Sequence, residues 1–378
     1  MHIAIIADPI DKQTAGIHYL TKHLIFNLLK FDKKNRYSII RFKKETDQLK
    51  SKTIVLKNTL LFLKNDPIRT FITLPLLLRK LNPDVVVETA HFGPFNLPKK
   101  IKRVTIIHDL SPIKFPKFHP FLSQYLQKLF FPGIIKRSDL LFTNSKNTSQ
   151  DLKSFYPESK SKICQLYLGK EDIFKPTKSE DIFKKYGINK PYFLSVGTIE
   201  PRKNLNTLLA AFSFFKKEHS SNIQLVIVGG DGWKTKSFYS ELNKHPFKND
   251  IKLIGYVNRL NLPALYSNAL AFIYPSYYEG FGLPVLEAMA CGAACIISNT
   301  SSLPEVGGEA ALYFNPERPE ELAERFNYIL TEKEVQDSMK EASIQQASMF
   351  TWKKYAQEFI DELETRFGKE VDSKPEPR

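Results

Sequence analysis

The chain of 378 residues exceeds the usual size of a single hydrophobic core, so two domains are expected. Its 42% hydrophobic and 25% charged residues exclude a disordered chain, and its longest apolar runs are too short to cross a bilayer. The formal net charge of +15 is uneven: residues 1–190 hold 35 Lys+Arg and 16 Asp+Glu (+19), whereas residues 191–378 hold 20 and 24 (−4). We expect an anionic partner for the basic half, with a lysine-rich solvated surface as the simpler alternative.

The first half of the chain predicts strands that alternate with helices. Helical spacing of Ile17, Leu20, Leu24 and Leu28 separates the first two apolar runs. The first run has no basic leader and no small-residue cleavage site, so we interpret it as a strand and not as a signal peptide. The runs expected to form strands are 2–8, 37–42, 84–89, 103–109 and 140–145.

The same pattern restarts after the polar segment 169–191, which is expected to connect the two halves. Strands alternating with helices indicate parallel, doubly wound sheets, so we predict an α/β protein with two Rossmann-like domains, 1–186 and 187–349. Ligands bind such sheets at the carboxyl ends of the strands, and two domains place the site in the cleft between them. The second set of expected strands is 192–197, 223–230, 251–257, 269–276 and 293–298.

The turn "GTIEPRKN" follows the first strand of the second half. Gly197 permits close approach of a ligand to the backbone, and Arg202 and Lys203 place two cations just before a helical segment. A glycine turn with cations at a helix start is typical of a diphosphate site. A solvated basic turn is the alternative interpretation.

The segment "YYEGFGLPVLEAMACG" (277–292) follows the strand 269–276 and opens a helix at Pro284. Gly280 and Gly282 allow close approach of a ligand. Glu279 precedes the helix and Glu287 lies one turn inside it. Carboxylates accept hydrogen bonds from hydroxyls but repel phosphates, which indicates a ligand with hydroxyls on both sides of a phosphate bridge. For Glu287 the alternative interpretation is that it binds no ligand and is an acid at a helix start, where the helix dipole favours negative charge.

Six segments together resemble the retaining glycosyltransferases of family 4, which have the GT-B fold. They are "EGFGLPVLE", "SVGTIEPRKN", "VIVGG", "LIGYV", "IIHDLSP" and "TNSKNTSQDL", and they occur in the family's order along nearly the whole chain. Within the family, the chain looks most like bacterial mannosyltransferases that build O-antigen and other surface polysaccharides. The resemblance implies an α/β GT-B architecture in which two Rossmann-like domains face a central cleft.

The resemblance also assigns roles to residues of the C-terminal domain, which holds the nucleotide sugar in the family. Arg202 and Lys203 correspond to the cations on the diphosphate, Glu279 to the acid that contacts the transferred hexose, and Glu287 to the acid that holds the ribose diol. The segment "GYV" corresponds to the loop beside the base. The implied nucleotide-sugar site comprises Gly16, Gly197, Arg202, Lys203, Gly255, Tyr256, Val257, Glu279, Gly280, Phe281, Gly282, Leu283 and Glu287.

From the N-terminal domain, His108 corresponds to a histidine near the anomeric centre, with Asp109 as a candidate to orient it. Gly16 corresponds to a glycine in the first loop, close to the donor phosphate and the acceptor. Two departures stand out: this loop has one glycine where many relatives have two, and Thr198 replaces an arginine that some relatives carry after the motif glycine.

The implied chemistry is substitution with retention, in which the leaving diphosphate takes the acceptor proton. The expected catalytic residues are Glu279, His108, Arg202 and Lys203, which position the substrates and stabilise charge on the departing phosphate. The chain contains no Asp-x-Asp motif, so we expect no metal and no cofactor. GDP-mannose is the expected donor, with other nucleotide sugars, including UDP-linked ones, left open.

In the family the N-terminal domain binds the acceptor, often a lipid-linked sugar. The segment 111–138 interleaves Lys and Arg with Phe, Tyr and Leu, which fits contact with an anionic membrane surface. The alternative is an amphipathic helix whose apolar stripe is core. We expect a cytoplasmic protein, peripheral at the inner face of the cell membrane if that contact forms, and a helix at 350–370 that crosses back onto the N-terminal domain.

Two other function classes compete with this hypothesis. A sugar-nucleotide epimerase on the same scaffold would bind the same donor, and a non-enzymatic nucleic-acid binder would account for the charge but would bind with steep salt dependence. A dinucleotide oxidoreductase is disfavoured because no Gly-x-Gly-x-x-Gly follows the first strand. We expect a nucleotide sugar and a glycan or lipid-linked acceptor as partners, and no nucleic acid.

Overall fold

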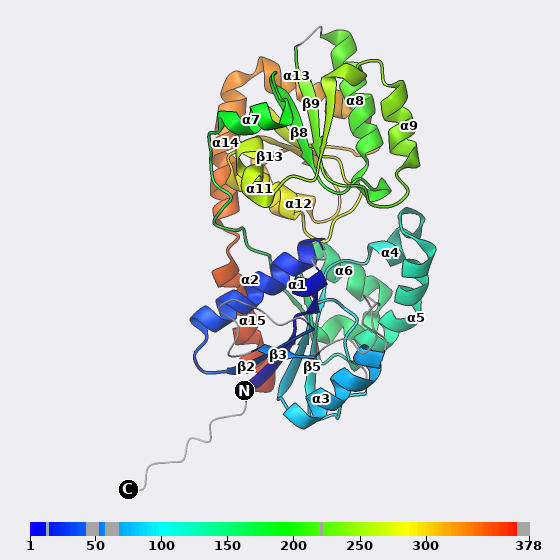
Figure 1. Cartoon of the computed structure of the whole chain (residues 1–378), viewed down its shortest axis with the longest axis vertical. Helices are drawn as coiled ribbons and strands as arrows, with labels where there is room; N and C mark the ends of the chain where they lie inside the picture. Colours follow the sequence, from blue (N-terminus) through cyan, green and yellow to red (C-terminus); the bar gives the residue numbers. More distant parts are fainter. Residues whose placement is uncertain (13–14, 43–52, 57–67, 95, 220–221, 369–378) are drawn as a thin grey trace.

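The computed structural model describes residues 1–12, 15–42, 53–56, 68–94, 96–219 and 222–368. Its described part forms two lobes, each built on one parallel sheet and stacked along the long axis of the molecule (Figure 1). The blue and cyan first half forms the lower lobe, and the green and yellow segments form the upper lobe.

The first sheet has seven parallel strands in the order β3-β2-β1-β4-β5-β6-β7. The order reverses between β1 and β4, so their carboxyl ends form the switch point where such sheets open a crevice. Its strands are β1 (His2–Ile6), β2 (Arg36–Arg41), β3 (Thr53–Val55), β4 (Val85–Glu88), β5 (Lys102–Ile107), β6 (Leu140–Thr143) and β7 (Ile163–Gln165). The helices of this half are α1 (Asp8–Lys12), α2 (Ala15–Phe31), η2 (Arg69–Thr73), α3 (Leu74–Leu81), α4 (Ser111–Lys114), η3 (Pro116–Phe118), α5 (Phe121–Arg137), α6 (Lys146–Phe155) and η4 (Pro157–Lys162).

The second sheet has six parallel strands in the order β10-β9-β8-β11-β12-β13, with its switch point between β8 and β11. Its strands are β8 (Tyr192–Val196), β9 (Gln224–Val228), β10 (Ile251–Gly255), β11 (Ala271–Tyr274), β12 (Cys295–Ser298) and β13 (Ala311–Phe314). The helices are α7 (Glu180–Tyr186), η5 (Pro201–Lys203), α8 (Leu205–Glu218), α9 (Lys236–Lys244), η6 (Lys248–Asp250), η7 (Arg259–Asn261), α10 (Leu262–Ser267), α11 (Leu283–Ala290), α12 (Leu303–Gly307), η8 (Gly308–Ala310), α13 (Pro319–Thr331), α14 (Lys333–Ser348) and α15 (Trp352–Phe367).

Apart from β10, which is partly exposed, the apolar runs of the sequence become mostly buried strands. In β1, Ile3 and Ile5 belong to one hydrophobic cluster, while Ala4 and Ile6 belong to another on the opposite face of the sheet. This is the pattern expected of a parallel sheet covered by helices on both sides. The short strands β3, β7 and β13 lie outside the runs expected from the sequence.

The C-terminal helix α15 returns to the first lobe, where it packs along α2 (Figure 1). The ring of Phe359 stacks on Phe142 of β6, with 4.5 Å between the ring centroids. The helix starts at Trp352 because the Thr351 hydroxyl caps it by accepting a hydrogen bond from the Lys354 amide. Residues 369 and 370 of the predicted helix lie outside the described residues. The predicted boundary at 186/187 places α7 in the first domain. In the structure, α7 packs against α10 in the second lobe.

Candidate active site

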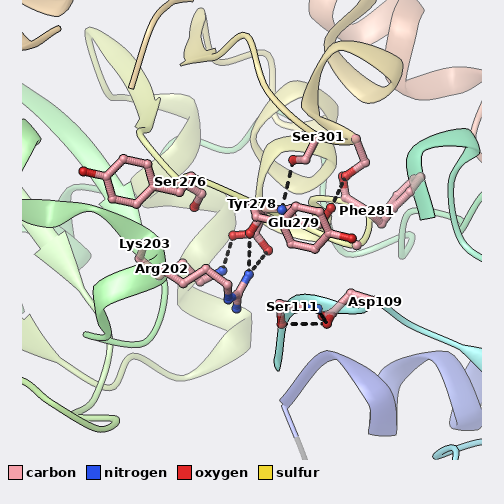
Figure 2. A network of polar contacts seen from close by, with 12 residues as sticks. Asp109, Ser111, Arg202, Lys203, Ser276, Tyr278, Glu279, Phe281 and Ser301 are labelled. Carbon is pink, nitrogen blue, oxygen red and sulfur yellow. Dashed lines mark hydrogen bonds and ion pairs between the residues drawn. The ribbon is translucent and has the colours of Figure 1, made fainter. Parts of the chain in front are cut away.

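The carboxyl ends of β8 and β11 bring together the acid and the two cations singled out in the sequence. Gly197 directly follows β8, the short helix η5 carries Arg202 and Lys203, and Glu279 lies in the loop between β11 and α11. Because β8 and β11 are adjacent parallel strands, their following loops must lie side by side. Figure 2 shows the three side chains converging.

Glu279 lies between the two cations. Its Oε2 accepts a hydrogen bond from Arg202 Nη1 at 2.8 Å, and its Oε1 accepts one from Lys203 Nζ at 2.7 Å. Arg202 Nη2 also donates to Glu200 at 2.6 Å, and Lys203 Nζ donates to the Tyr274 hydroxyl at 2.6 Å. The carboxylates of Glu279 and Glu200 are both buried, so these ion pairs form a charged network inside the protein.

Burial alone would raise the pKa of Glu279, but Arg202 and Lys203 outweigh it and lower that pKa to about 2. Burial lowers the pKa of the Lys203 ammonium, and the nearby carboxylate opposes this. Arg202 has its pKa raised despite burial, since Glu279, Glu200 and Asp109 all favour its charge. The cluster therefore balances two cations with two acids.

Arg202 has an unpaired Nε donor in this cluster. Its Nε is buried and has no hydrogen-bond partner among the described residues. An unpaired buried donor costs free energy, on the order of 1–3 kcal/mol, which an incoming oxygen acceptor would recover. Lys203 Nζ has three hydrogens and donates to two partners, Tyr274 and Glu279. The cluster can therefore accept an anionic oxygen beside each cation.

His108 follows β5 in the first lobe, and its backbone lies against Gly280, one residue after Glu279. A Cβ built on Gly280 would lie 2.0 Å from the His108 carbonyl oxygen, so the two backbones touch and only glycine fits. The His108 ring donates from Nε2 to the Thr89 carbonyl at 2.7 Å, and Nδ1 accepts from the Asn144 amide at 3.1 Å. Burial lowers the pKa of His108, although the bond to Thr89 opposes this. The ring is therefore held as a neutral imidazole.

Asp109 does not orient His108 as the sequence suggested. Its Oδ1 accepts hydrogen bonds from the Ser111 amide and hydroxyl, at 2.8 and 2.7 Å, and so fixes the start of α4. In Figure 2, Asp109 and Ser111 lie on a separate segment below Glu279.

The glycines around the start of α11 lie at the meeting point of the lobes. Gly282, with φ of 116°, precedes the first turn of α11, and this left-handed conformation favours glycine. A Cβ on Gly16 would lie 3.4 Å from Leu283 Cδ1, so the start of α2 reaches the start of α11. The Phe281 side chain is buried near Tyr167 and Phe350, so a ligand can meet only its backbone.

Glu287 belongs to a second network. Its Oε1 accepts from Arg259 Nη2 at 2.6 Å, and its Oε2 accepts from the Tyr266 hydroxyl at 3.2 Å. Arg259 also pairs with Glu171 of the connecting segment and lies 3.7 Å from the ring centroid of Tyr19 on α2. Burial raises the pKa of Glu287, and Arg259 opposes this. Sequence reasoning missed Arg259, although it lies just beyond the "GYV" segment.

The three residues of "GYV" face different surroundings. Gly255, with φ of 65°, ends β10, and its carbonyl accepts a hydrogen bond from the Gly229 amide at 2.8 Å. Val257 is buried, whereas Tyr256 is 81% exposed at the surface. Of this segment, Tyr256 therefore offers the side chain that a ligand can reach.

The structure contributes two further findings about binding capacity. Within the described ranges, no group of three or more His, Cys, Asp or Glu side chains is arranged to hold a metal ion. In these same ranges, no helix has both the length and the apolar character needed to span a membrane.

Comparison with known proteins decides the family. Residues 43–169 match the model of "Glycosyltransferase Family 4", and residues 178–346 match that of "Glycosyl transferases group 1". The O-antigen chain mannosyltransferase B of Escherichia coli is 32% identical over 268 residues, which cover 69% of this chain and 70% of that protein. The chain belongs to glycosyltransferase family 4. The predicted family is therefore confirmed, and the epimerase and nucleic-acid-binding alternatives gain no support.

Solved structures confirm the GT-B fold of this family 4 chain. Sucrose-phosphate synthase from Thermosynechococcus elongatus superposes with a TM-score of 0.78 at 19% identity, covering 97% of this chain and 99% of that one. The HepE protein of Anabaena, solved in complex with UDP-glucose, superposes with a TM-score of 0.75 at 16% identity, covering 97% and 100%. Both superpositions span nearly the whole of each chain, so this chain shares their fold.

Proposed function

We propose that this family 4 chain is a retaining, metal-independent hexosyltransferase. It transfers mannose from GDP-mannose to a glycan or lipid-linked acceptor in the synthesis of a surface polysaccharide. Its similarity to an O-antigen chain mannosyltransferase supports the sugar and the pathway class. The complex of HepE with UDP-glucose supports a nucleotide sugar as the donor class.

The observation that carries the proposal is the buried cluster of Glu279, Arg202 and Lys203, next to the backbone contact between Gly280 and His108. The free Nε of Arg202 and the remaining hydrogen of Lys203 Nζ are suited to the oxygens of a diphosphate. Glu279, ionised with a pKa of about 2, accepts hydrogen bonds from hexose hydroxyls. One cluster thus binds both the phosphate and the sugar of a nucleotide sugar.

In the proposed reaction, the bond from the anomeric carbon to the diphosphate oxygen breaks as the acceptor hydroxyl approaches the same face. The acceptor oxygen bonds to the anomeric carbon, and its proton passes to the departing phosphate. Arg202 and Lys203 stabilise the charge that builds up on that phosphate. Glu279 is negative throughout, so it stabilises the oxocarbenium-like carbon and cannot serve as a general acid.

In the proposed reaction, His108 is a positioning residue that helps to fix how the two lobes meet. Its two ring nitrogens are already engaged by Thr89 and Asn144, so it presents a fixed neutral ring at the end of β5. Its carbonyl touches Gly280, one residue after Glu279. The contact sets how closely the acceptor lobe approaches the anomeric carbon. Correct positioning of two reactants can raise the rate of their reaction by orders of magnitude.

The test is transfer by the purified chain from a panel of GDP- and UDP-linked sugars to lipid-linked and free glycans. We expect transfer from GDP-mannose, undiminished by EDTA, with the α configuration of mannose retained in the NMR spectrum of the product. A β-linked product would overturn retention, and dependence on added Mg²⁺ would overturn metal independence. Conversion of the donor to an epimer without acceptor would overturn transferase activity itself.

A further inference from the structure

Helix α5 leaves its first half uncovered. Phe121 is 80% exposed, Leu122 67%, Tyr125 56% and Leu129 57%. Their spacing places them on neighbouring turns, so they form one apolar stripe along the helix surface. The second half of α5 is covered, because Phe131, Ile134 and Ile135 are buried in a hydrophobic cluster with Leu110 and Leu152. The core interpretation of the segment 111–138 therefore holds only for its second half.

A second group of exposed apolar side chains lies on η2 and α3. Ile72 is 54% and Leu76 57% exposed, and Phe71 is also exposed. The ring of Phe71 lies 6.0 Å from that of Phe130 on α5, and the exposed Phe92 lies 6.2 Å from Phe130, measured between ring centroids. These ring contacts join the two groups into one surface, here named the α3–α5 face. It comprises Phe71, Ile72, Leu76, Phe92, Phe121, Leu122, Tyr125 and Leu129.

The segments that form this face carry positive charge and no carboxylate. Residues 68–83 contain three Lys or Arg, residues 89–100 contain two and residues 111–138 contain five, against no Asp or Glu. Of these ten cations, Arg69 is buried and pairs with Asp8, and Lys114 pairs with Asp151, which leaves eight for the surface. On α5, Lys128, Lys136 and Arg137 are exposed. Monomeric proteins rarely expose contiguous apolar surface of this kind without a partner. Apolar side chains among cations complement a surface with an apolar interior and anionic headgroups.

We propose that the α3–α5 face docks on an anionic lipid bilayer. Phe121 and Leu122, near the start of α5, insert among the acyl chains, while the lysines meet the headgroups. The docking surface adjoins the cleft, because Phe118, three residues before Phe121, stacks on Tyr277 of the second lobe with 5.3 Å between ring centroids. An acceptor anchored in the bilayer therefore emerges beside the active site. The inference does not depend on the identity of the donor sugar.

The experiment is sedimentation of the full chain with vesicles of phosphatidylcholine alone or with 30% phosphatidylglycerol, without any sugar nucleotide. We expect binding to the anionic vesicles, at least tenfold weaker without phosphatidylglycerol and progressively weaker with added salt. The variant Phe121→Ser, Leu122→Ser and Tyr125→Ser should bind at least tenfold more weakly. A matched control changes three exposed apolar residues on other elements, Phe155→Ser, Tyr328→Ser and Met349→Ser, and should bind like wild type.

A charge pair completes the test. Lys128→Glu with Lys136→Glu should weaken binding to anionic vesicles, whereas Lys217→Glu with Lys244→Glu, exposed on the second lobe, should not. Circular dichroism checks that each variant is folded. Equal binding by the two triple variants, or none by wild type, would overturn the proposal. So would a wild-type dimer that the Phe121 triple variant converts to monomer without a change in vesicle binding, since the face would then bind a second copy.

Failure of this inference is distinguishable from failure of the proposed function. Transfer to a water-soluble glycan reports on the active site alone and should be unchanged in the Phe121 triple variant. Transfer to an acceptor embedded in anionic vesicles should fall with vesicle binding. Loss of both activities would point to a damaged lobe and contradict a role confined to docking.

Discussion

Gly280 offers a sharp test of how the two lobes meet. A Cβ at this position would lie 2.0 Å from the His108 carbonyl oxygen and 2.9 Å from its carbon, both backbone atoms that cannot rotate away. An ordinary carbon–oxygen contact is about 3.3 Å, so Gly280→Ala requires the lobes to separate locally by roughly 1.3 Å. A misplacement of about 1 Å at a reacting centre can cost about 100-fold in rate.

We therefore expect Gly280→Ala to lower kcat by about 100-fold, which corresponds to about 2.7 kcal/mol in the activation free energy. The dissociation constant for GDP, measured by calorimetry, should change less than threefold, because Arg202 and Lys203 lie on one lobe. Gly230→Ala is the control, since a Cβ there meets nothing within 4 Å. A Gly280→Ala enzyme with wild-type kcat would refute the contact as a determinant of the reactive geometry.

Three further predictions concern the charged groups. Lys203→Ala and Glu279→Ala should each reduce kcat by about 100- to 1,000-fold in the transfer assay and leave the circular dichroism spectrum unchanged, whereas Lys217→Ala should be neutral. Because the folded pKa of Glu279 is depressed from 4.5 to about 2, its contribution to stability is present above pH 4.5 and is lost as the pH falls toward 2. Urea unfolding of wild type should show this loss, at most roughly 3 kcal/mol, and Glu279→Gln should lack it. Glu305 accepts hydrogen bonds from the Lys146 and Asn147 amides across the lobes, at 2.7 and 2.8 Å, so Glu305→Ala should increase the radius of gyration in X-ray scattering, unlike the exposed Glu309→Ala.

Each of these predictions has a contrary result. Near wild-type transfer by either alanine variant would remove that side chain from the reaction. An identical pH dependence of unfolding for wild type and Glu279→Gln would show that the carboxylate titrates normally. An unchanged scattering curve for Glu305→Ala would show that other contacts hold the lobes together.

The fold could be predicted wherever the physical signal was local. Strands such as β1 and β8 are buried on both sides, so their sequences are continuous apolar runs. The strands β3, β7 and β13 have three or four residues and are partly exposed, so no comparable run marks them. The convergence of Glu279 with Arg202 and Lys203 was predictable because adjacent parallel strands end at one edge of a sheet.

The rest of the site depends on contacts between distant segments. Arg259 pairs with Glu171, 88 residues away, and with Glu287, and no periodic pattern links these positions. The contact of Gly280 with His108 joins the two lobes and follows from their mutual packing. Glu200 lies within the motif "GTIEPRKN", but its pairing with Arg202 depends on the turn of η5. Contacts of this kind could not be predicted from the sequence, because they depend on how distant segments pack together.

The most direct test of the central claim is a crystal structure of the chain with GDP-mannose. We predict that the diphosphate lies against Arg202 Nε and Lys203 Nζ, that a mannose hydroxyl donates to Glu279, and that the anomeric carbon faces the end of β5 at His108. A donor bound away from Glu279, or a diphosphate without contact to either cation, would contradict the account.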